Sequence, residues 1–134
     1  MRAYTYIDRA SARLGNAYHE RRWSAFMGLT VALLDKTARF DWLAAPSPSG
    51  ESIEFAFSSR ERLFQPLDFG SVEWSEENSP MGATLVARWV GQHVDVTIRS
   101  FLFHDKPGFV RVVSVANKTV DILNLDKVML DAFV

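Results

Sequence analysis

Residues 85–130 read LVARWVGQHVDVTIRSFLFHDKPGFVRVVSVANKTVDILNLDKVML, and this stretch decides the fold class. It is rich in β-branched and aromatic residues, which favour the pleated, half-buried surface of a sheet. Three short groups of turn residues divide it, at 91–92, 105–108 and 117–119. The stretch therefore predicts four successive antiparallel strands, at 85–90, 94–104, 109–116 and 120–130.

The second of these strands shows the period-two pattern of a sheet with one buried and one wet face. Its apolar residues Val94, Val96 and Ile98 alternate with polar neighbours. The alternation fails at residues 100–103 (SFLF), where either a β-bulge or burial of both faces accounts for the pattern. The sequence leaves both explanations open.

Residues 109–116 carry apolar side chains on both faces of the predicted strand. Phe109, Val113 and Val115 point to one side, and Val110 and Val112 point to the other. We therefore expect this strand to lie in a central, covered position, as in a two-layer β architecture.

Composition narrows the class of protein. The length predicts one domain, spanning residues 1–134. A domain of this size can bury a hydrophobic core without needing disulfides or a structural metal ion. A net charge of −1 argues against nucleic-acid partners, and the lack of cysteine excludes disulfides and thiolate chemistry. The chain shows neither an apolar run of about 20 residues, as a membrane span needs, nor the apolar core of a secretory signal. We expect no membrane partner, and a cytoplasmic location is slightly favoured.

Further strand patterns precede residue 85. Ile7, Ala10 and Leu14 have helical spacing and Gly15 follows them, so the sequence predicts a short helix at 5–14. The other expected elements are strands at 17–26, 29–34, 37–43, 52–58 and 67–76, a loop at 44–50, and irregular segments at 59–66 and 77–82. The whole chain reads as an all-β, antiparallel β-sandwich of about nine or ten strands with a short N-terminal helix.

Two segments together resemble a known family. The first runs through residues 14–16 (LGN), 20–23 (ERRW), 31–36 (VALLDK) and Trp42, and the second through 103–111 (FHDKPGFVR) and 115–119 (VANKT). They are similar to the N-terminal β-sandwich of alpha-galactosidase-type glycoside hydrolases (the melibiase clan, family 36). That domain is a galactose-mutarotase-like supersandwich.

The resemblance implies a non-catalytic role for this chain. In that family the catalytic carboxylates lie in a separate (β/α)₈ barrel after the sandwich, and such a barrel needs about 250 residues. The chain ends at Val134, so the resemblance implies either the N-terminal part of a larger protein or a reduced, stand-alone sandwich. No catalytic residue carries over, because none of the matching positions is catalytic in the family.

Two acidic groups are candidates for catalytic carboxylates, since glycoside hydrolysis usually needs a pair at a defined separation. They are Glu73, Glu76 and Glu77, and Asp121, Asp126 and Asp131. The five-residue interval of the aspartates places neighbours on opposite faces of a strand, so we interpret both groups as solvated surface. His93 and His104 stand about 35 Å apart along one predicted strand, which denies them a shared metal site. We predict no catalytic residue, no metal site and no cofactor.

Trp42, Trp74 and Trp89 are the candidate ligand-binding residues, because sugar rings stack their C–H faces on indoles. The competing interpretation is that each tryptophan fills the core. Trp74 stands beside glutamates and a predicted loop, which makes it the least core-like of the three. Arg21 and Arg22 lie within a predicted strand and are expected to pair with acidic side chains.

Three functions compete at this point. The leading one is a non-catalytic N-terminal β-sandwich module of a glycoside hydrolase, whose partner is the parent's catalytic domain or a like subunit. The alternatives are a free-standing carbohydrate- or small-ligand-binding sandwich and a small enzyme with a pocket among its strands. A truncated sandwich leaves an unpaired strand edge or an uncovered apolar face, so we expect a homo-oligomer.

Overall fold

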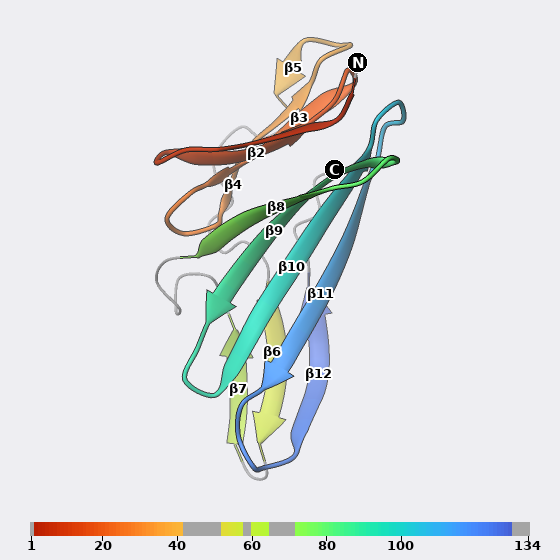
Figure 1. Ribbon diagram of the computed structural model, residues 1–134. Helices are drawn as coiled ribbons and strands as arrows, with labels where there is room; N and C mark the ends of the chain where they lie inside the picture. Colours follow the sequence, from red (N-terminus) through yellow and green to blue (C-terminus); the bar gives the residue numbers. More distant parts are fainter. Residues whose placement is uncertain (1, 42–51, 58–59, 65–71, 130–134) are drawn as a thin grey trace.

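The computed structural model describes residues 2–41, 52–57, 60–64 and 72–129, and in them it contains twelve strands and no helix (Figure 1). All the strand pairs are antiparallel. The predicted fold class, an all-β antiparallel sandwich, is confirmed. The strands form a five-stranded, a four-stranded and a three-stranded sheet.

The five-stranded sheet is a simple meander in the order β1-β2-β3-β4-β5. Its strands are β1 (Tyr4–Ile7), β2 (Ser11–Gly15), β3 (His19–Ser24), β4 (Thr30–Asp35) and β5 (Phe40–Asp41). The strands predicted at 17–26, 29–34 and 37–43 correspond to β3, β4 and β5. The predicted loop at 44–50 lies outside the described residues.

The helix predicted at 5–14 is wrong, because this segment forms β1, a tight turn and β2. The Asp8 carboxylate accepts hydrogen bonds from the backbone N–H groups of Ala10 and Ser11, both at 2.8 Å. A short acidic side chain satisfies a turn in the same way as it caps a helix, so the local signal was ambiguous. Burial decides between the two, since Ala12 and Leu14 alternate into the core at 0% exposure, as strand residues do.

The four-stranded sheet has the order β11-β10-β9-β8. Its strands are β8 (Glu73–Asn78), β9 (Gly82–Val90), β10 (Val94–Phe103) and β11 (Phe109–Asn117). The three-stranded sheet, in the order β12-β6-β7, contains β6 (Ser52–Phe57), β7 (Arg60–Phe64) and β12 (Leu123–Met129). Residues 60–64 are thus a strand rather than the irregular segment predicted at 59–66, and β8 extends to Asn78, into the segment expected to be irregular.

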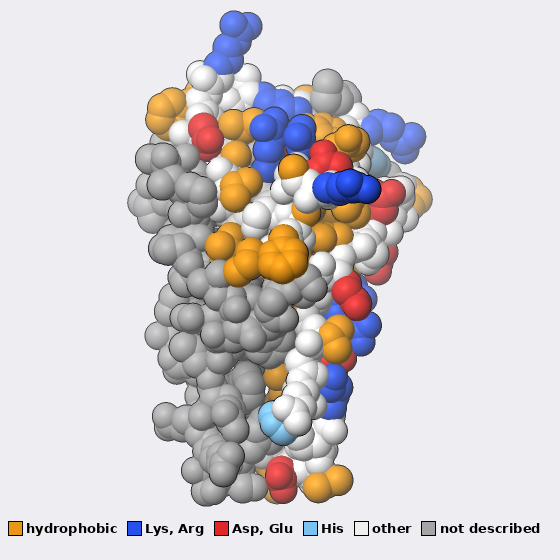
Figure 2. Space-filling model, turned by 90° about the vertical axis from the view of Figure 1, so that its left-hand side faces the viewer, with side chains coloured by type: hydrophobic (Ala, Val, Ile, Leu, Met, Phe, Trp, Pro, Cys, Tyr) orange, Lys and Arg blue, Asp and Glu red, His pale blue; other side chains and the backbone are white. Residues whose placement is uncertain are grey.

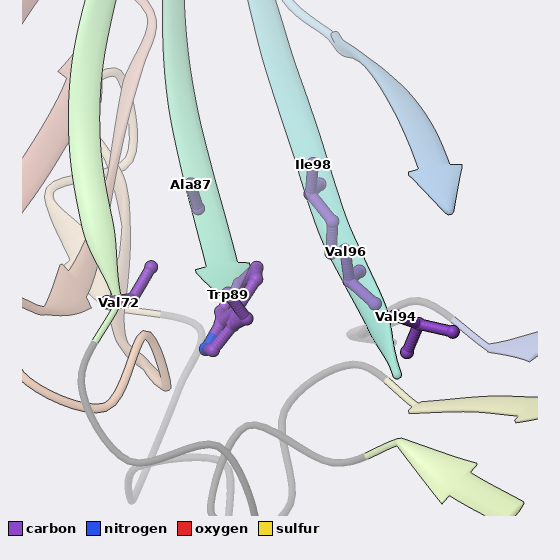
Figure 3. Close-up of a cluster of buried hydrophobic side chains, with 6 residues drawn as sticks. All are labelled: Val72, Ala87, Trp89, Val94, Val96 and Ile98. Carbon is purple, nitrogen blue, oxygen red and sulfur yellow. The ribbon is translucent and has the colours of Figure 1, made fainter. Parts of the chain in front are cut away.

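The four-stranded sheet forms one layer of the sandwich, and the other two sheets cover different parts of the same face of it. In Figure 1 the five-stranded sheet lies at its upper end, and the three-stranded sheet lies behind its lower half. At the upper end Leu85 and Leu102 pack with Leu14 and Trp23 of the five-stranded sheet. At the lower end a second cluster forms, which Figure 3 shows in close-up. Its buried members are Val72, Ala87, Trp89, Val94, Val96 and Ile98, and Leu123 of β12 packs against them.

The irregular pattern at residues 100–103 is not a bulge. β10 pairs with both neighbours in unbroken register through this segment. Ser100 and Leu102 continue the buried face, at 3% and 0% exposure, while Phe101 and Phe103 lie half-buried on the opposite face. The rings of Phe101 and Phe103 meet edge to face at 4.8 Å, so partial burial of both faces explains the sequence.

The central position expected for residues 109–116 is wrong, since β11 is an edge strand of the four-stranded sheet. Val110 and Val112 are 49% and 52% exposed, whereas Val113 and Val115 are half-buried against the lower cluster. Apolar residues on both faces of a strand can mean a covered strand or an edge with an apolar outer side. The local pattern is the same in both cases.

We expect Gly82→Ala to destabilise the sandwich. A Cβ at Gly82 would collide with the backbone carbonyl of Leu102 and lie 2.7 Å from the Phe101 ring, and neither can move without disturbing the β9–β10 pairing. Overpacking of this kind costs about 1–3 kcal/mol in the free energy of unfolding, which urea denaturation measures. Ser75→Ala, at an exposed position of the same sheet, is the control and changes this free energy by less than about 0.5 kcal/mol.

Candidate functional site

Two of the three predicted tryptophans lie in the described residues, and Trp42 lies outside them. Trp89 is 1% exposed and belongs to the lower core cluster (Figure 3). A Cβ at Gly28 would lie 2.5 Å from the Trp89 ring, and Gly28 has a φ of 74°, so a glycine is required where the chain crosses the indole. Trp89 therefore offers no exposed ring face to a sugar.

Trp74 is half-buried and joins the two core clusters. Its ring lies 6.0 Å from that of Trp23, and its Nε1–H donates to the Ala25 carbonyl at 2.7 Å. A tryptophan whose indole N–H is held by the backbone and whose ring packs on both clusters acts first as a structural link. Trp74 and Trp89 do not form a common exposed platform.

The three glutamates of β8 lie on the surface, as predicted, and Asp121 is also exposed. Glu73 and Glu77 form ion pairs across the sheet with Arg88 at 3.5 Å and with Arg99 at 3.6 Å. Glu76 points to the other face, where it accepts a hydrogen bond from Thr5. Asp131 and the side chain of Asp126 lie outside what the structure describes.

A charged network crosses the outer face of the four-stranded sheet. Asp95 of β10 lies 2.9 Å from Arg88 and 2.9 Å from Lys118, and Arg88 in turn approaches Glu73. The hydrogen bonds from Lys118 and Arg88 hold the pKa of Asp95 below its ordinary value. Each acid faces a base, so this network is a stabilising surface rather than a reactive site.

The densest polar cluster lies on the outer face of the five-stranded sheet, around Glu20. The Tyr4 hydroxyl and the Arg22 guanidinium each donate to the Glu20 carboxylate, and Lys36 Nζ donates to the Tyr4 hydroxyl at 2.9 Å. The Tyr4 ring lies across the sheet over Gly15, where a Cβ would stand 2.5 Å from the tyrosine oxygen. Gly15 thus provides the space that lets Tyr4 reach Glu20.

The electrostatics of this cluster favour an ionised Glu20. Burial acts to raise the pKa of Glu20, which is 6% exposed, but the hydrogen bonds from Tyr4 and Arg22 and the charges of Arg22 and Lys36 outweigh burial and lower that pKa. Burial and the adjacent Glu20 carboxylate raise the pKa of Tyr4. A carboxylate held in this way is a poor proton donor at neutral pH.

The inner face of the same sheet holds the β10–β11 turn. Asn16 is fully buried, and its side-chain amide donates to the carbonyls of Phe103 and Lys106 at 2.9 and 2.8 Å. His19 Nε2 accepts from Gly108 N–H at 3.3 Å, and its ring lies 4.5 Å from that of Phe109. Two side chains of the five-stranded sheet therefore fasten a turn of the four-stranded sheet.

The two adjacent arginines of β3 have different environments, because successive strand residues face opposite ways. Arg22 pairs with Glu20, as expected. Arg21 is 5% exposed, lies 5.1 Å from the Trp23 ring centre and donates to the Thr30 hydroxyl at 2.9 Å. Arg21 is thus part of the interior.

Positive side chains dominate the neighbourhood of Glu20. Figure 2 shows lysine and arginine side chains gathered in the upper part of the view, at the height of the five-stranded sheet in Figure 1. Arg13 adds to this group and lies 5.4 Å from the centre of the Tyr6 ring. Each of these contacts joins groups within the chain.

The described residues contain no group of three or more histidine, aspartate or glutamate side chains that could hold a metal ion. The same residues form no helix with the length and apolarity that a membrane span requires. Arginine, lysine, tyrosine, threonine or backbone groups engage the carboxylates of Asp8, Glu20, Glu73, Glu76, Glu77 and Asp95. The arrangement is suited to holding sheets together.

Sequence reasoning missed the contributions of Tyr4, Asn16 and Lys36 to these clusters. A signal existed, since residues 14–16 and 20–23 had been singled out as a motif, and Asn16 and Glu20 are two of its central members. Their partners could not be identified, because Tyr4 precedes the segment predicted as a helix, where no strand was expected to pair with residues 11–15, and the β10–β11 turn is distant in sequence.

No protein-family model matches the chain, and neither the curated proteins nor the solved structures include a significant match.

We expect Tyr4→Phe to reduce the free energy of unfolding at neutral pH by about 2 kcal/mol, because a buried carboxylate loses a hydrogen-bond donor. The lowered pKa of Glu20 stabilises the fold above the ordinary glutamate pKa of about 4.3, and this contribution is lost as the pH falls through the lowered value. The difference between variant and parent should therefore shrink in acid. Urea denaturation across pH measures it, with the exposed Tyr6→Phe as control, and an equal loss at all pH values would contradict this account.

The His19 contact should respond to pH in the same direction. Burial lowers the pKa of His19, and Lys36 lowers it further although Asp35 acts to raise it. Neutral His19 therefore stabilises the fold above the ordinary histidine pKa of about 6.5, and this is lost as the pH falls through the lowered value. Protonated Nε2 cannot accept from Gly108, so the hydrogen-exchange protection factor of the Gly108 amide should fall. His19→Gln should remove this pH dependence.

Proposed function

We propose that this chain is a non-catalytic β-sandwich module of a glycoside hydrolase, which packs on and supports the catalytic domain of its parent protein. One observation carries the proposal. The polar residues of the motif that resembles the family's N-terminal sandwich, Asn16, Glu20 and Arg21, are all at most 6% exposed and bind other parts of the sandwich. Buried structural roles are what a scaffold module requires of them.

The geometry of the carboxylates supports the same proposal. Glycoside hydrolysis uses one carboxyl group that stays protonated and a second carboxylate across the scissile bond, about 5–10 Å away. Glu20 has a lowered pKa and is enclosed by Tyr4 and Arg22, which suits neither role. Glu73 and Glu77 lie on one exposed face of an edge strand and pair with arginines.

A second candidate function, a carbohydrate-binding sandwich, is favoured by one local feature. Phe26 is 65% exposed, and its neighbour Ala25 holds the Trp74 indole N–H. An exposed aromatic ring beside a half-buried tryptophan resembles the start of a stacking surface. Tryptophan fluorescence titrated with mono- and oligosaccharides tests this candidate, and Phe26→Ala should abolish any response that this surface produces.

Activity measurements test the main proposal. The purified 134-residue chain should hydrolyse no aryl α- or β-glycoside, whereas the complete natural gene product, carrying this sandwich and its barrel, should hydrolyse at least one. Tyr6→Phe is the neutral control in the complete product. Hydrolysis by the 134-residue chain that Glu20→Gln abolishes would refute the proposal, as would a natural product that contains no further domain.

A further inference from the structure

The two edges of the four-stranded sheet differ sharply in their chemistry. β8, at one edge, carries three glutamates in six residues, Glu73, Glu76 and Glu77. Charged side chains along an edge discourage pairing with another chain. β11, at the other edge, has nine residues with the sequence FVRVVSVAN, in which Arg111 is the only charge and proline and lysine are absent.

The backbone of β11 is also regular. It pairs with β10 over nine consecutive positions with no register shift, so no bulge turns its outer edge away. In the part of the chain that the structure describes, β10 is its only neighbour in the sheet, and in Figure 1 it forms the right-hand side of that sheet. A long, regular edge of this kind is a template for another strand.

The outer face beside this edge carries exposed apolar side chains near residues 110–112. Val110 and Val112 are 49% and 52% exposed, and Phe101, which is opposite Val110 in β10, is only half-buried. Surface burial of valine and phenylalanine would add to the backbone hydrogen bonds of a strand pair. The backbone edge of β11 and the apolar side chains beside it therefore both favour contact with another strand.

We propose that β11 pairs antiparallel with β11 of a second copy of this chain, so that the two four-stranded sheets join into one continuous sheet across a two-fold axis. This interface is independent of the proposed function, because it needs neither a barrel nor a sugar. It is isologous, as closed dimers require, since the same strand contributes from both copies.

The sequence of β11 is self-complementary in this arrangement. The antiparallel register that pairs all nine residues places Val113 opposite its own copy. It then sets Val112 against Ser114, Val110 against Ala116, and Arg111 against Val115. No like charges stand opposite one another, and Arg111 is the only charged residue that each strand brings to the pair.

Val112→Glu tests the pairing. In the single chain this position is opposite Arg99, so the substitution is compatible with the fold. In the dimer the two new carboxylates become diagonal neighbours, and each loses the apolar contact that valine made. We expect the parent chain to sediment as a dimer and the dissociation constant of the variant to rise at least about tenfold. Ser75→Glu adds the same charge to the β8 edge and should leave the dimer intact.

Cysteine cross-linking tests the register. The chain contains no cysteine, so Val113→Cys places one thiol on the two-fold axis. Opposed residues of antiparallel strands have Cα atoms about 4.5–5.5 Å apart, within the range of a disulfide. Mild oxidation should give a covalent dimer, and Ser75→Cys under the same conditions should not.

Three results would overturn the proposal. They are a parent chain that stays monomeric at every concentration tested, a Val112→Glu variant that dimerises as tightly as the parent, and a Val113→Cys chain that does not cross-link. Circular dichroism identifies any variant that fails to fold, in which case the cross-linking result decides. Loss of glycosidase activity in the complete gene product bears on the proposed function alone.

Discussion

The structure depends on burial of one face of β10 (Val94–Phe103). Alternate residues of this strand, from Val94 to Leu102, are at most 3% exposed, and two sheets divide the task of covering them. The five-stranded sheet covers the end near Leu102, and β12 of the three-stranded sheet approaches the end near Val94. Because the covering layer is split, the five-stranded sheet needs its own ties to the four-stranded sheet, and Asn16 and His19 provide two of them.

Several polar side chains hold the two layers of the sandwich together through hydrogen bonds. Asn16 and His19 hold the β10–β11 turn, and Trp74 joins the two core clusters while its N–H bonds to Ala25. Glu20 has the same role within its own sheet, where Tyr4 crosses Gly15 to reach it. Satisfied buried polar groups fix one arrangement of a core, since any other arrangement would leave them unpaired. Polar residues used in this way favour a single, rigid arrangement of the sheets.

The outer surface of the four-stranded sheet differs from one edge of the sheet to the other. Near β8 this outer face carries ion pairs around Arg88 and Asp95. Toward β11 it carries the exposed side chains of Val110 and Val112. A strand edge is normally protected when it faces solvent throughout the life of a protein. The contrast between a glutamate-rich β8 and a valine-rich β11 therefore indicates that the two edges meet different surroundings.

The sequence by itself determined the all-β class, the four strands after residue 82, the turn at 105–108, where Gly108 has a positive φ, and the solvated glutamates of β8. These features depend on period-two alternation and on turn residues, which act between neighbours in the chain. Tertiary structure alone decided that residues 5–14 are two strands, that β11 is an edge, and that Glu20 meets Tyr4. Each of these outcomes depends on which distant segment lies alongside. A local pattern that fits two environments is resolved only by the burial that the rest of the fold imposes.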